Sequence, residues 1–178
     1  DIDGEAAGDY SGGSVSLSSD GNTMAIGAQG NGNDAGHVRV YENIAGSWSQ
    51  IGGDIDGEGV YDNSGHSVSL SGDGNTVAIG AMRNDGNGSD AGHVRIYENT
   101  GGSWTQIGGD IDGEAVGDWS GWSVSLSSDG NTVAIGATDN DGNGYYESGH
   151  VRIYNYDGSS WNQIGADIDG EASSDHSG

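Results

Sequence analysis

Hydrophobic and polar residues alternate most regularly in the segment 120–137, SGWSVSLSSDGNTVAIGA. Val124 and Leu126 alternate with serines, and the run 132–136 alternates again with β-branched residues on one side. A period of two is typical of β-strands and not of helices. An Asp-Gly pair between the two runs supplies the positive φ of a tight turn, so the segment predicts a β-hairpin.

The same pattern occurs twice more, at residues 11–28 and 64–81. The sequence Asp-Ile-Asp-Gly-Glu begins at residues 1, 54, 110 and 167, so the spacings are 53, 56 and 57 residues. Repetition at a period of this size marks propellers, solenoids or other arrays. The predicted organisation is a partial connector, three repeats and the start of a fourth, with boundaries at 1–12, 13–63, 64–119, 120–170 and 171–178.

Each repeat holds four strand-like segments separated by turn-forming residues, which in the second repeat are 67–71, 76–81, 93–98 and 103–107. Four short antiparallel strands per repeat is the plan of a β-propeller blade. Val, Ile and Leu occupy one alternation and Ser, Ala or Gly the other, which favours face-to-face stacking of successive sheets. We therefore expect an all-β fold of β-propeller blades, as three four-stranded antiparallel repeats of about 53–57 residues.

Propellers usually have four to eight blades. Three blades leave two terminal sheet faces uncovered, so we expect further blades from the same chain or from another subunit. The chain also lacks an initiator Met and begins and ends in the same connector, which is the pattern expected of a piece of a longer repeat protein.

Charge narrows the class of partner. The chain of 178 residues has 28 acidic residues against four Arg and no Lys, for a formal net charge of −24. Such a chain repels nucleic acid and anionic membrane surfaces. It contains no apolar run long enough for membrane insertion and no Cys for disulfides or thiolate metal sites. Cations, basic proteins and neutral glycans are the expected partners, and a saline environment is the competing explanation of the acidity.

The hairpin pattern SGxSVSL followed by VAIGA, with the later strand Gly-His-Val-Arg-Ile-Tyr, resembles the FG-GAP repeat. This repeat is the blade unit of integrin α-subunit propellers and of many bacterial surface proteins. The resemblance implies an extracellular or cell-surface propeller that serves in cell adhesion or as a structural protein. Two departures stand out. The family's calcium loop is reduced to an Asp-Gly-Asn turn, so that site is not carried over. The family's Phe is replaced by serine at Ser11, Ser64, Ser120 and Ser177.

The acids are expected to gather on one rim. In a four-stranded meander, the loop between strands two and three lies at the same end as the connection between repeats. Sixteen acids lie in the connections and six in these loops, which places 22 of the 28 on one rim. The loops also differ most between repeats. A protein or glycan partner is therefore expected at this acidic rim.

Two acidic sets meet the needs of Ca²⁺, which takes six to eight oxygen ligands. The loop of the third repeat fits the pattern DxDxNGxxE, with Asp139, Asp141, Asn143 and Glu147 as ligands. The connection DIDGExxxD supplies the other set, which in the second repeat is Asp54, Asp56, Glu58 and Asp62. The alternative for the connection is a solvated acidic loop, with one carboxylate pairing with the Arg of a neighbouring blade. The alternative for the loop of the third repeat is a plain Gly-Asn turn.

Aromatic residues on the rim suggest a glycan platform. Trp119 and Trp122 occur in one repeat only, and Tyr145 and Tyr146 lie in the loop of the same repeat. Exposed aromatic rings provide flat contact area at low entropic cost. The alternative is that these rings pack on the adjacent blade. In the second repeat, Asn87 begins the only glycosylation sequon.

Three residue types recur at one position in every repeat, which indicates structural roles. The tryptophans are expected to pack in the core or at the blade edge, and each Arg is expected to pair with a carboxylate of the DIDGE connection. These positions are Trp48, Trp104 and Trp161, His37, His93 and His150, and Arg39, Arg95 and Arg152.

No spacing typical of a Ser–His–acid triad accompanies the many serines. The leading interpretation is thus a non-enzymatic, extracellular propeller segment that acts as an adhesion or structural scaffold with a calcium-binding rim. The alternatives are a lectin-like, glycan-binding module and an enzyme with its site on the propeller axis.

Overall fold

A computed structural model covers residues 1–178 and describes every side chain except that of Asn143. The regular secondary structure of the described chain is almost entirely β-strand, joined by turns and loops, with one short turn of helix, α1 (Asn31–Asp34), and one 3₁₀ turn, η1 (Gly142–Gly144). Within α1, Gly32 and Asn33 have positive φ, so this segment is a compact turn and not a regular helix. No helix in the described chain has the length and apolar character needed to span a bilayer.

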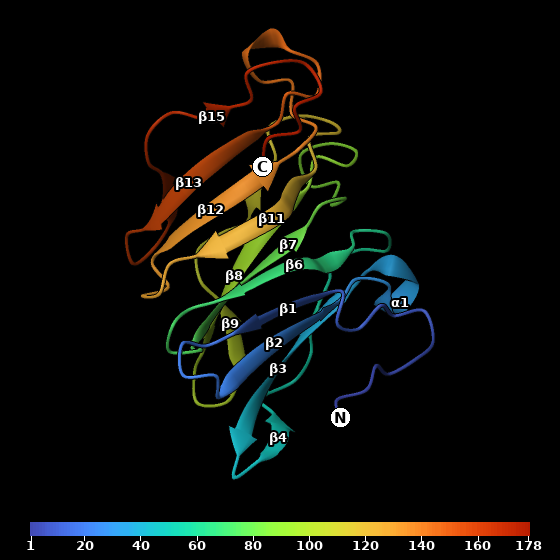
Figure 1. Ribbon diagram of the computed structural model, residues 1–178, viewed down its shortest axis with the longest axis vertical. Helices are drawn as coiled ribbons and strands as arrows, with labels where there is room; N and C mark the ends of the chain where they lie inside the picture. The colour runs from blue at the N-terminus through green and yellow to red at the C-terminus, as the bar shows by residue number, and fades with distance from the viewer.

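Three antiparallel sheets follow one another along the chain and stack along the long axis of the molecule (Figure 1). The first sheet contains β1 (Ser14–Leu17), β2 (Thr23–Ala28), β3 (His37–Ile44), β4 (Ser47–Gln50) and β5 (Ile55–Asp56). The second contains β6 (Ser64–Leu70), β7 (Thr76–Ala81), β8 (His93–Asn99), β9 (Trp104–Gln106) and β10 (Ile111–Asp112). The third contains β11 (Ser120–Leu126), β12 (Thr132–Ala137), β13 (His150–Tyr156), β14 (Trp161–Gln163) and β15 (Ile168–Asp169).

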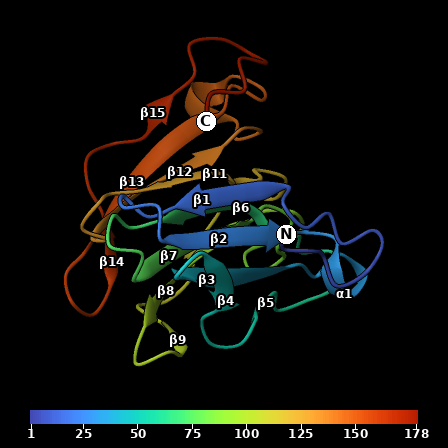
Figure 2. The ribbon, with the colours of Figure 1, turned by 60° about the horizontal axis from the view of Figure 1, so that its bottom comes forward.

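Each sheet is a four-stranded meander whose outer strand is interrupted. In the first sheet, β4 and β5 both pair with β3, so together they form the fourth strand with a break between them. The other two sheets repeat this arrangement. The first strands β1, β6 and β11 lie side by side in the middle of the stack (Figures 1 and 2). The predicted all-β fold of propeller blades is confirmed, and the three blades do not close a ring by themselves.

The hairpin turns between the first two strands are held by their own side chains. In the first blade, the Ser18 hydroxyl donates to Asp20 Oδ1 at 2.7 Å, and the Asn22 backbone N–H donates to the same oxygen at 2.9 Å. These bonds, led by the one from Ser18, lower the pKa of Asp20 to about 2. The turn carboxylate is thus already engaged, in keeping with the reduced calcium loop.

The hydrophobic core lies between blades and not within any one of them. Val38, Val40 and Ile55 of the first blade pack against Leu70 and Ile79 of the second. An equivalent cluster joins the second and third blades. Because a sheet buries its apolar face only against another layer, the alternation of large and small residues read from the sequence is what couples neighbouring blades.

Serines of the first strands add hydrogen bonds between blades. The Ser14 hydroxyl donates to the Gly65 carbonyl oxygen at 2.7 Å, and Ser16 Oγ accepts from the Leu70 N–H at 2.9 Å. Ser67 and Ser69 make the same two bonds to the third blade. The Ser-Val-Ser-Leu sequence therefore bonds to the following blade through its serines, while its Val and Leu face the preceding blade.

The serine that replaces the family's Phe contacts the preceding blade through its backbone. Ser64 forms a parallel bridge with Gly36 of the preceding blade, and its N–H donates to the Ala35 carbonyl at 3.0 Å. A Cβ added at Gly36 would overlap Ser64. Close backbone contact thus takes the place of aromatic packing at this position.

Candidate functional site

The loops between the second and third strands meet the connections between blades, as predicted. The Asn63 N–H donates to the Asp34 carbonyl at 2.8 Å, and the Trp119 N–H donates to the Asp90 carbonyl at 3.2 Å. In the third blade, the His176 N–H donates to the Glu147 carbonyl at 3.3 Å. These contacts place the acids of loops and connections on a common rim, which we call the acidic rim.

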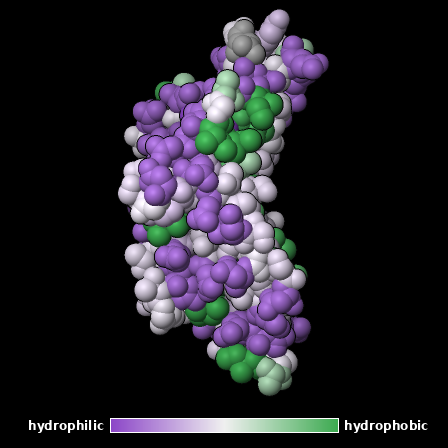
Figure 3. All heavy atoms as spheres, turned by 90° about the vertical axis from the view of Figure 1, so that its left-hand side faces the viewer, coloured by the Kyte–Doolittle hydropathy of each residue, from purple (hydrophilic) through white to green (hydrophobic). Residues whose placement is uncertain are grey.

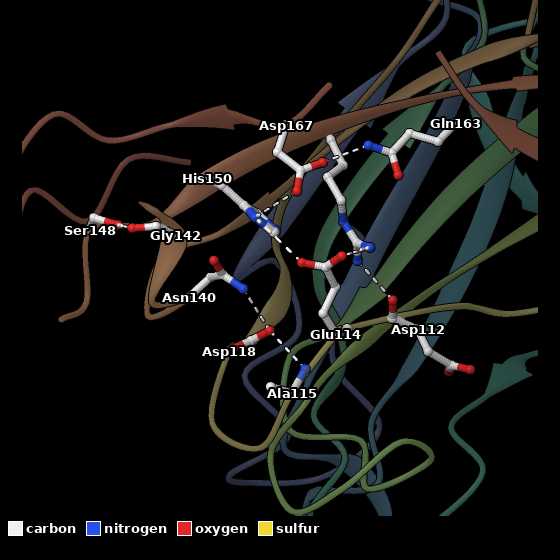
Figure 4. Close-up of polar contacts among 12 residues, drawn as sticks. Asp112, Glu114, Ala115, Asp118, Asn140, Gly142, Ser148, His150, Gln163 and Asp167 are labelled. Atoms are coloured by element: carbon white, nitrogen blue, oxygen red, sulfur yellow. Dashed lines mark hydrogen bonds and ion pairs between the residues drawn. The ribbon is translucent and has the colours of Figure 1, made fainter. Parts of the chain in front are cut away.

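The last acid of each connection is structural. Asp62 is buried, and its Oδ2 accepts from the Gly59 N–H at 3.0 Å and from the Asn84 side-chain amide at 2.8 Å. Asp118 repeats the arrangement with Ala115 and Asn140 (Figure 4). A carboxylate oxygen with two donors has little remaining capacity for a cation, so Asp62 serves to fold the connection.

The other predicted ligands of this connection face different blades. Asp54 approaches His37 of the first blade at 3.9 Å, whereas Glu58 approaches His93 of the second at 4.0 Å. The Asp56 carbonyl accepts from the Arg95 guanidinium at 2.8 Å, and its side chain is exposed. The structure therefore does not bring Asp54, Asp56, Glu58 and Asp62 together as one coordination set.

The loop of the third blade, in contrast, borders an acidic cavity of about 670 Å³. Its lining includes three of the predicted calcium ligands, Asp139, Asp141 and Glu147, while the side chain of Asn143 lies outside the described residues. Asp141 Oδ1 accepts from the Glu147 N–H at 2.8 Å and thereby closes the loop. Further acids from the connections before and after this blade also line the cavity, namely Glu114, Asp118, Asp167 and Asp169.

The predicted aromatic residues form two groups. The rings of Trp119 and Trp122 stack with centroids 5.5 Å apart and an interplanar angle of 10°. Trp122 also contacts the ring of His66 in the second blade at 4.7 Å, and Arg83 lies over Trp119 at 6.0 Å. The pair therefore packs on the adjacent blade, while Trp122 remains partly exposed, and its role as a glycan platform stays a prediction.

Tyr145 and Tyr146 lie apart from this pair, on the loop of the third blade. Both are exposed, and Tyr146 lines the acidic cavity. The sequon residue Asn87 is exposed as well, but its side-chain amide donates to the Gly113 carbonyl at 2.8 Å. Its modification remains a prediction.

Each recurrent Arg is buried and pairs with a carboxylate of the DIDGE connection, as predicted. Arg95 Nη1 lies 3.3 Å from Glu58 Oε1, and Arg152 Nη1 lies 3.4 Å from Glu114 Oε1. The corresponding distance from Arg39 to Glu5 is 3.8 Å. The recurrent Trp104 and Trp161 donate their indole N–H groups to carbonyls of the preceding blade. These residues tie the blades together.

One grouping was missed at the sequence level, since the recurrent His was interpreted only as structural. Each His Nδ1 faces one carboxylate from the connection before its blade and one from the connection after it. The groups are Glu5, His37 and Asp54, then Glu58, His93 and Asp110, then Glu114, His150 and Asp167. The signal was present, because His and Arg share one alternation and the DIDGE acids recur at both ends of each blade.

Burial first, and the neighbouring Arg95 second, lower the pKa of His93 to about 4, and burial with the neighbouring Arg152 lowers the pKa of His150. Both imidazoles are therefore neutral at pH 7. Their contacts with carboxylates at 4.0 Å are not ion pairs, and they are too long for hydrogen bonds. The three groups are the described residues best arranged to hold a metal ion.

Residues 55–97 match the FG-GAP repeat family, which confirms the predicted resemblance over the second repeat. No curated protein sequence matches the chain.

The fold is similar to that of three solved proteins. A putative 6-phosphogluconolactonase from Bacteroides uniformis has 13% identity and a TM-score of 0.62, over 90% of this chain and 41% of that one. Sqt1 from Saccharomyces cerevisiae has 15% identity and a TM-score of 0.56, over 89% and 36%. Hydrazine synthase from Kuenenia stuttgartiensis has 15% identity and a TM-score of 0.57, over 97% and 38%. At such identities the likeness shows the fold alone, and this chain spans about two fifths of their length.

Proposed function

We propose that this chain is a segment of a non-enzymatic, extracellular or cell-surface β-propeller that acts as an adhesion or structural scaffold. The observation that carries the proposal is the acidic cavity of the third blade, whose lining includes seven acidic residues. No basic side chain is among its described lining residues. A site of this kind attracts a cationic partner, or a divalent cation that bridges to oxygen ligands of a partner. The FG-GAP match of the second repeat supports the extracellular setting.

Calcium is the cation we propose for this cavity. Asp139, Asp141 and Glu147 belong to the loop, and the carboxylate of Asp169, from β15, lies beside Gly142 of that loop. Carboxylate oxygens are the ligands that Ca²⁺ prefers, and its flexible coordination tolerates a loop of this kind. Binding there relieves repulsion among the clustered acids of a chain whose net charge is −24.

The test is a calcium titration by isothermal calorimetry on EDTA-treated protein, with thermal melting alongside. We expect saturable binding and a higher melting temperature, both reduced in a variant carrying Asp139→Asn and Asp141→Asn. Glu98→Gln, which alters an exposed acid at the end of β8, is the matched control. Absence of binding, or binding that the double variant retains, would leave the cavity acids as solvating charge and remove the support for a calcium-bridged scaffold.

A second candidate is glycan binding, which the stacked Trp119–Trp122 pair favours. The partly exposed face of Trp122 offers an aromatic platform of the kind that stacks on sugar rings. We expect Trp122→Ala to abolish binding on a glycan array, while Trp48→Ala, at an equally exposed Trp of the first blade, leaves it unchanged. An array without signal, or signal that Trp122→Ala does not alter, argues against this candidate.

Further blades are proposed partners of the terminal sheet faces. The first blade exposes Val15 and Leu17, and the third exposes Ile164 and Ile168. Figure 3 shows a hydrophobic patch near the end of the molecule that holds the third blade. Exposed apolar faces of a sheet are covered in propellers by the adjacent blade, which supports a ring completed by further repeats of this kind.

A further inference from the structure

We propose that each blade carries a binding site for a divalent transition-metal ion, built from the recurrent His and from one Glu and one Asp of the two flanking connections. The proposal does not rest on calcium binding or on any partner, although the third-blade group shares Glu114 and Asp167 with the lining of the acidic cavity. Its central ligand is a recurrent His that the sequence pattern assigns to structure alone. In the second blade the ligands are Glu58 Oε2, His93 Nδ1 and a carboxylate oxygen of Asp110.

The first observation is that the buried imidazole of His93 has an unsatisfied nitrogen. The residue is only 1% exposed, and its Nδ1 has no hydrogen-bond partner among the described residues. Burying a polar nitrogen without a partner costs free energy. That nitrogen faces the Glu58 carboxylate at 4.0 Å, with an Asp110 oxygen in the same group. A metal ion between them would satisfy all three atoms at once.

The separations of the ligand atoms fit such an ion. In the third blade, His150 Nδ1 lies 4.0 Å from Glu114 Oε2 and 3.9 Å from Asp167 Oδ2, and all three atoms lie within 4.8 Å of one another. Given these limits, a point equidistant from the three atoms is at most about 2.5 Å from each, so shifts of a few tenths of an ångström reach the roughly 2.0–2.2 Å of zinc–nitrogen and zinc–oxygen bonds. Figure 4 shows His150 between the two carboxylates.

Side chains outside the proposed site hold each carboxylate so that one of its oxygens faces the His. In the second blade, Glu58 Oε1 lies 3.3 Å from Arg95 Nη1, which leaves Oε2 turned toward His93. Asp110 Oδ1 accepts from the Gln106 side-chain amide at 2.7 Å. Metal-binding carboxylates are characteristically fixed in this way by hydrogen bonds to the oxygen that does not bind the metal. Gln50 and Gln163 occupy the same role beside Asp54 and Asp167.

The donor set selects the class of metal. Imidazole nitrogen suits Zn²⁺ and its neighbours in the first transition row, whereas Ca²⁺ and Mg²⁺ prefer oxygen throughout. Three protein ligands leave at least one position for water or for a partner's side chain. Because Glu58 and Asp110 belong to the connections before and after the blade, a bound ion would fasten both connections to the same strand.

The experiment uses the 178-residue chain, stripped with EDTA and titrated with Zn²⁺ alone by calorimetry. Visible absorption of the Co²⁺-loaded protein serves as a second readout. We expect zinc binding that saturates at up to three ions per chain, a raised melting temperature and Co²⁺ absorption typical of a nitrogen–oxygen site. Asp110→Asn and His93→Gln should each remove one ion from the stoichiometry, and Gln106→Leu should weaken the second-blade site by about tenfold or more.

Glu98→Gln is the matched control, since it removes one acidic charge outside the three groups, and it should leave the zinc stoichiometry unchanged. If circular dichroism shows that His93→Gln does not fold, the zinc stoichiometry of Asp110→Asn and Glu58→Gln provides the test instead, because both variants alter exposed side chains. Zinc uptake that these variants leave unaltered, or a stripped protein that takes up no zinc, overturns the proposal. Asp139→Asn with Asp141→Asn should reduce calcium binding and spare the second-blade zinc site, which separates the two proposals.

Discussion

Residues at equivalent positions have opposite environments at the inner faces of the stack, where one blade meets another, and at its two outer faces, which no blade of this chain covers. Ile55 and Ile111, which end the first and second blades, are each 5% exposed, whereas Ile168 at the same position of the third blade is 55% exposed. Leu70 and Leu126 are buried, whereas Leu17 of the first blade is 57% exposed. The local sequence is nearly identical in each case, so the neighbouring blade alone decides whether the residue is core.

The comparison shows that stability resides in the interfaces between blades. Each sheet forms its ladder locally, but it obtains its apolar burial only from the next sheet. Repeat proteins of this kind have a stability that is approximately a sum of repeat and nearest-neighbour terms. Substitutions at matched positions of inner and outer faces should therefore measure the interface directly.

The largest difference is expected between Ile111→Ala and Ile168→Ala. Ile111 belongs to the cluster that joins the second and third blades, so its truncation should lower the free energy of unfolding by about 2–5 kcal/mol. Ile168 is already mostly in solvent, and its truncation should cost less than about 1 kcal/mol. Urea denaturation followed by circular dichroism compares the two variants. Equal losses would mean that the blade interface does not carry the stability.

A smaller difference is expected between Trp104→Phe and Trp48→Phe. The Trp104 indole N–H donates to the Ile51 carbonyl of the preceding blade at 2.9 Å. Its loss should cost about 1 kcal/mol beyond the change in ring size. Trp48 has no preceding blade in this chain and makes no such bond among the described residues, so its variant reports the same substitution without the hydrogen bond and without the packing of Trp104 on the core cluster. Denaturation midpoints of the two variants, measured under one condition, provide the comparison. Matching midpoints would mean that this hydrogen bond does not contribute to stability.

The strands and turns could be predicted from the sequence because their signals are local. The alternation of Val124 and Leu126 with serines is sufficient to predict β11, and the Asp-Gly pair is sufficient to predict the turn that follows it. The placement of loops and connections on one rim followed from the topology of a meander. All of these require only neighbours in the chain or in the same sheet.

The composition of the sites could not be predicted in the same way. Asp54 and Glu58 lie four residues apart, yet they face histidines of different blades. Spacing along the chain does not reveal this division, because it depends on where the connection crosses from one sheet to the next. The burial of Asp62 has the same origin, since its partner Asn84 lies in a loop of the following blade.

The smallest effect concerns the pH dependence of stability at the contact between the second and third blades. Burial first, and the nearby Arg83 second, lower the pKa of His66, whose ring contacts Trp122. The folded chain therefore resists protonation that the unfolded chain accepts near the ordinary value of 6.5. The free energy of unfolding should decline as pH falls below that value. His66→Gln should make this decline shallower, because the variant lacks the proton-accepting ring in both states.

Denaturation at several pH values between about 5 and 7.5 measures the slope of each protein. Arg83→Gln sharpens the comparison, because it removes the smaller of the two causes that lower the pKa of His66. Its slope should lie between those of the parent and His66→Gln, closer to the parent, since burial is the larger cause. The remaining histidines of lowered pKa, His93 and His150, are common to all three proteins and cancel in the difference. A slope in His66→Gln as steep as that of the parent would assign the whole pH dependence to those two residues and leave the inter-blade aromatic contact without a role in it.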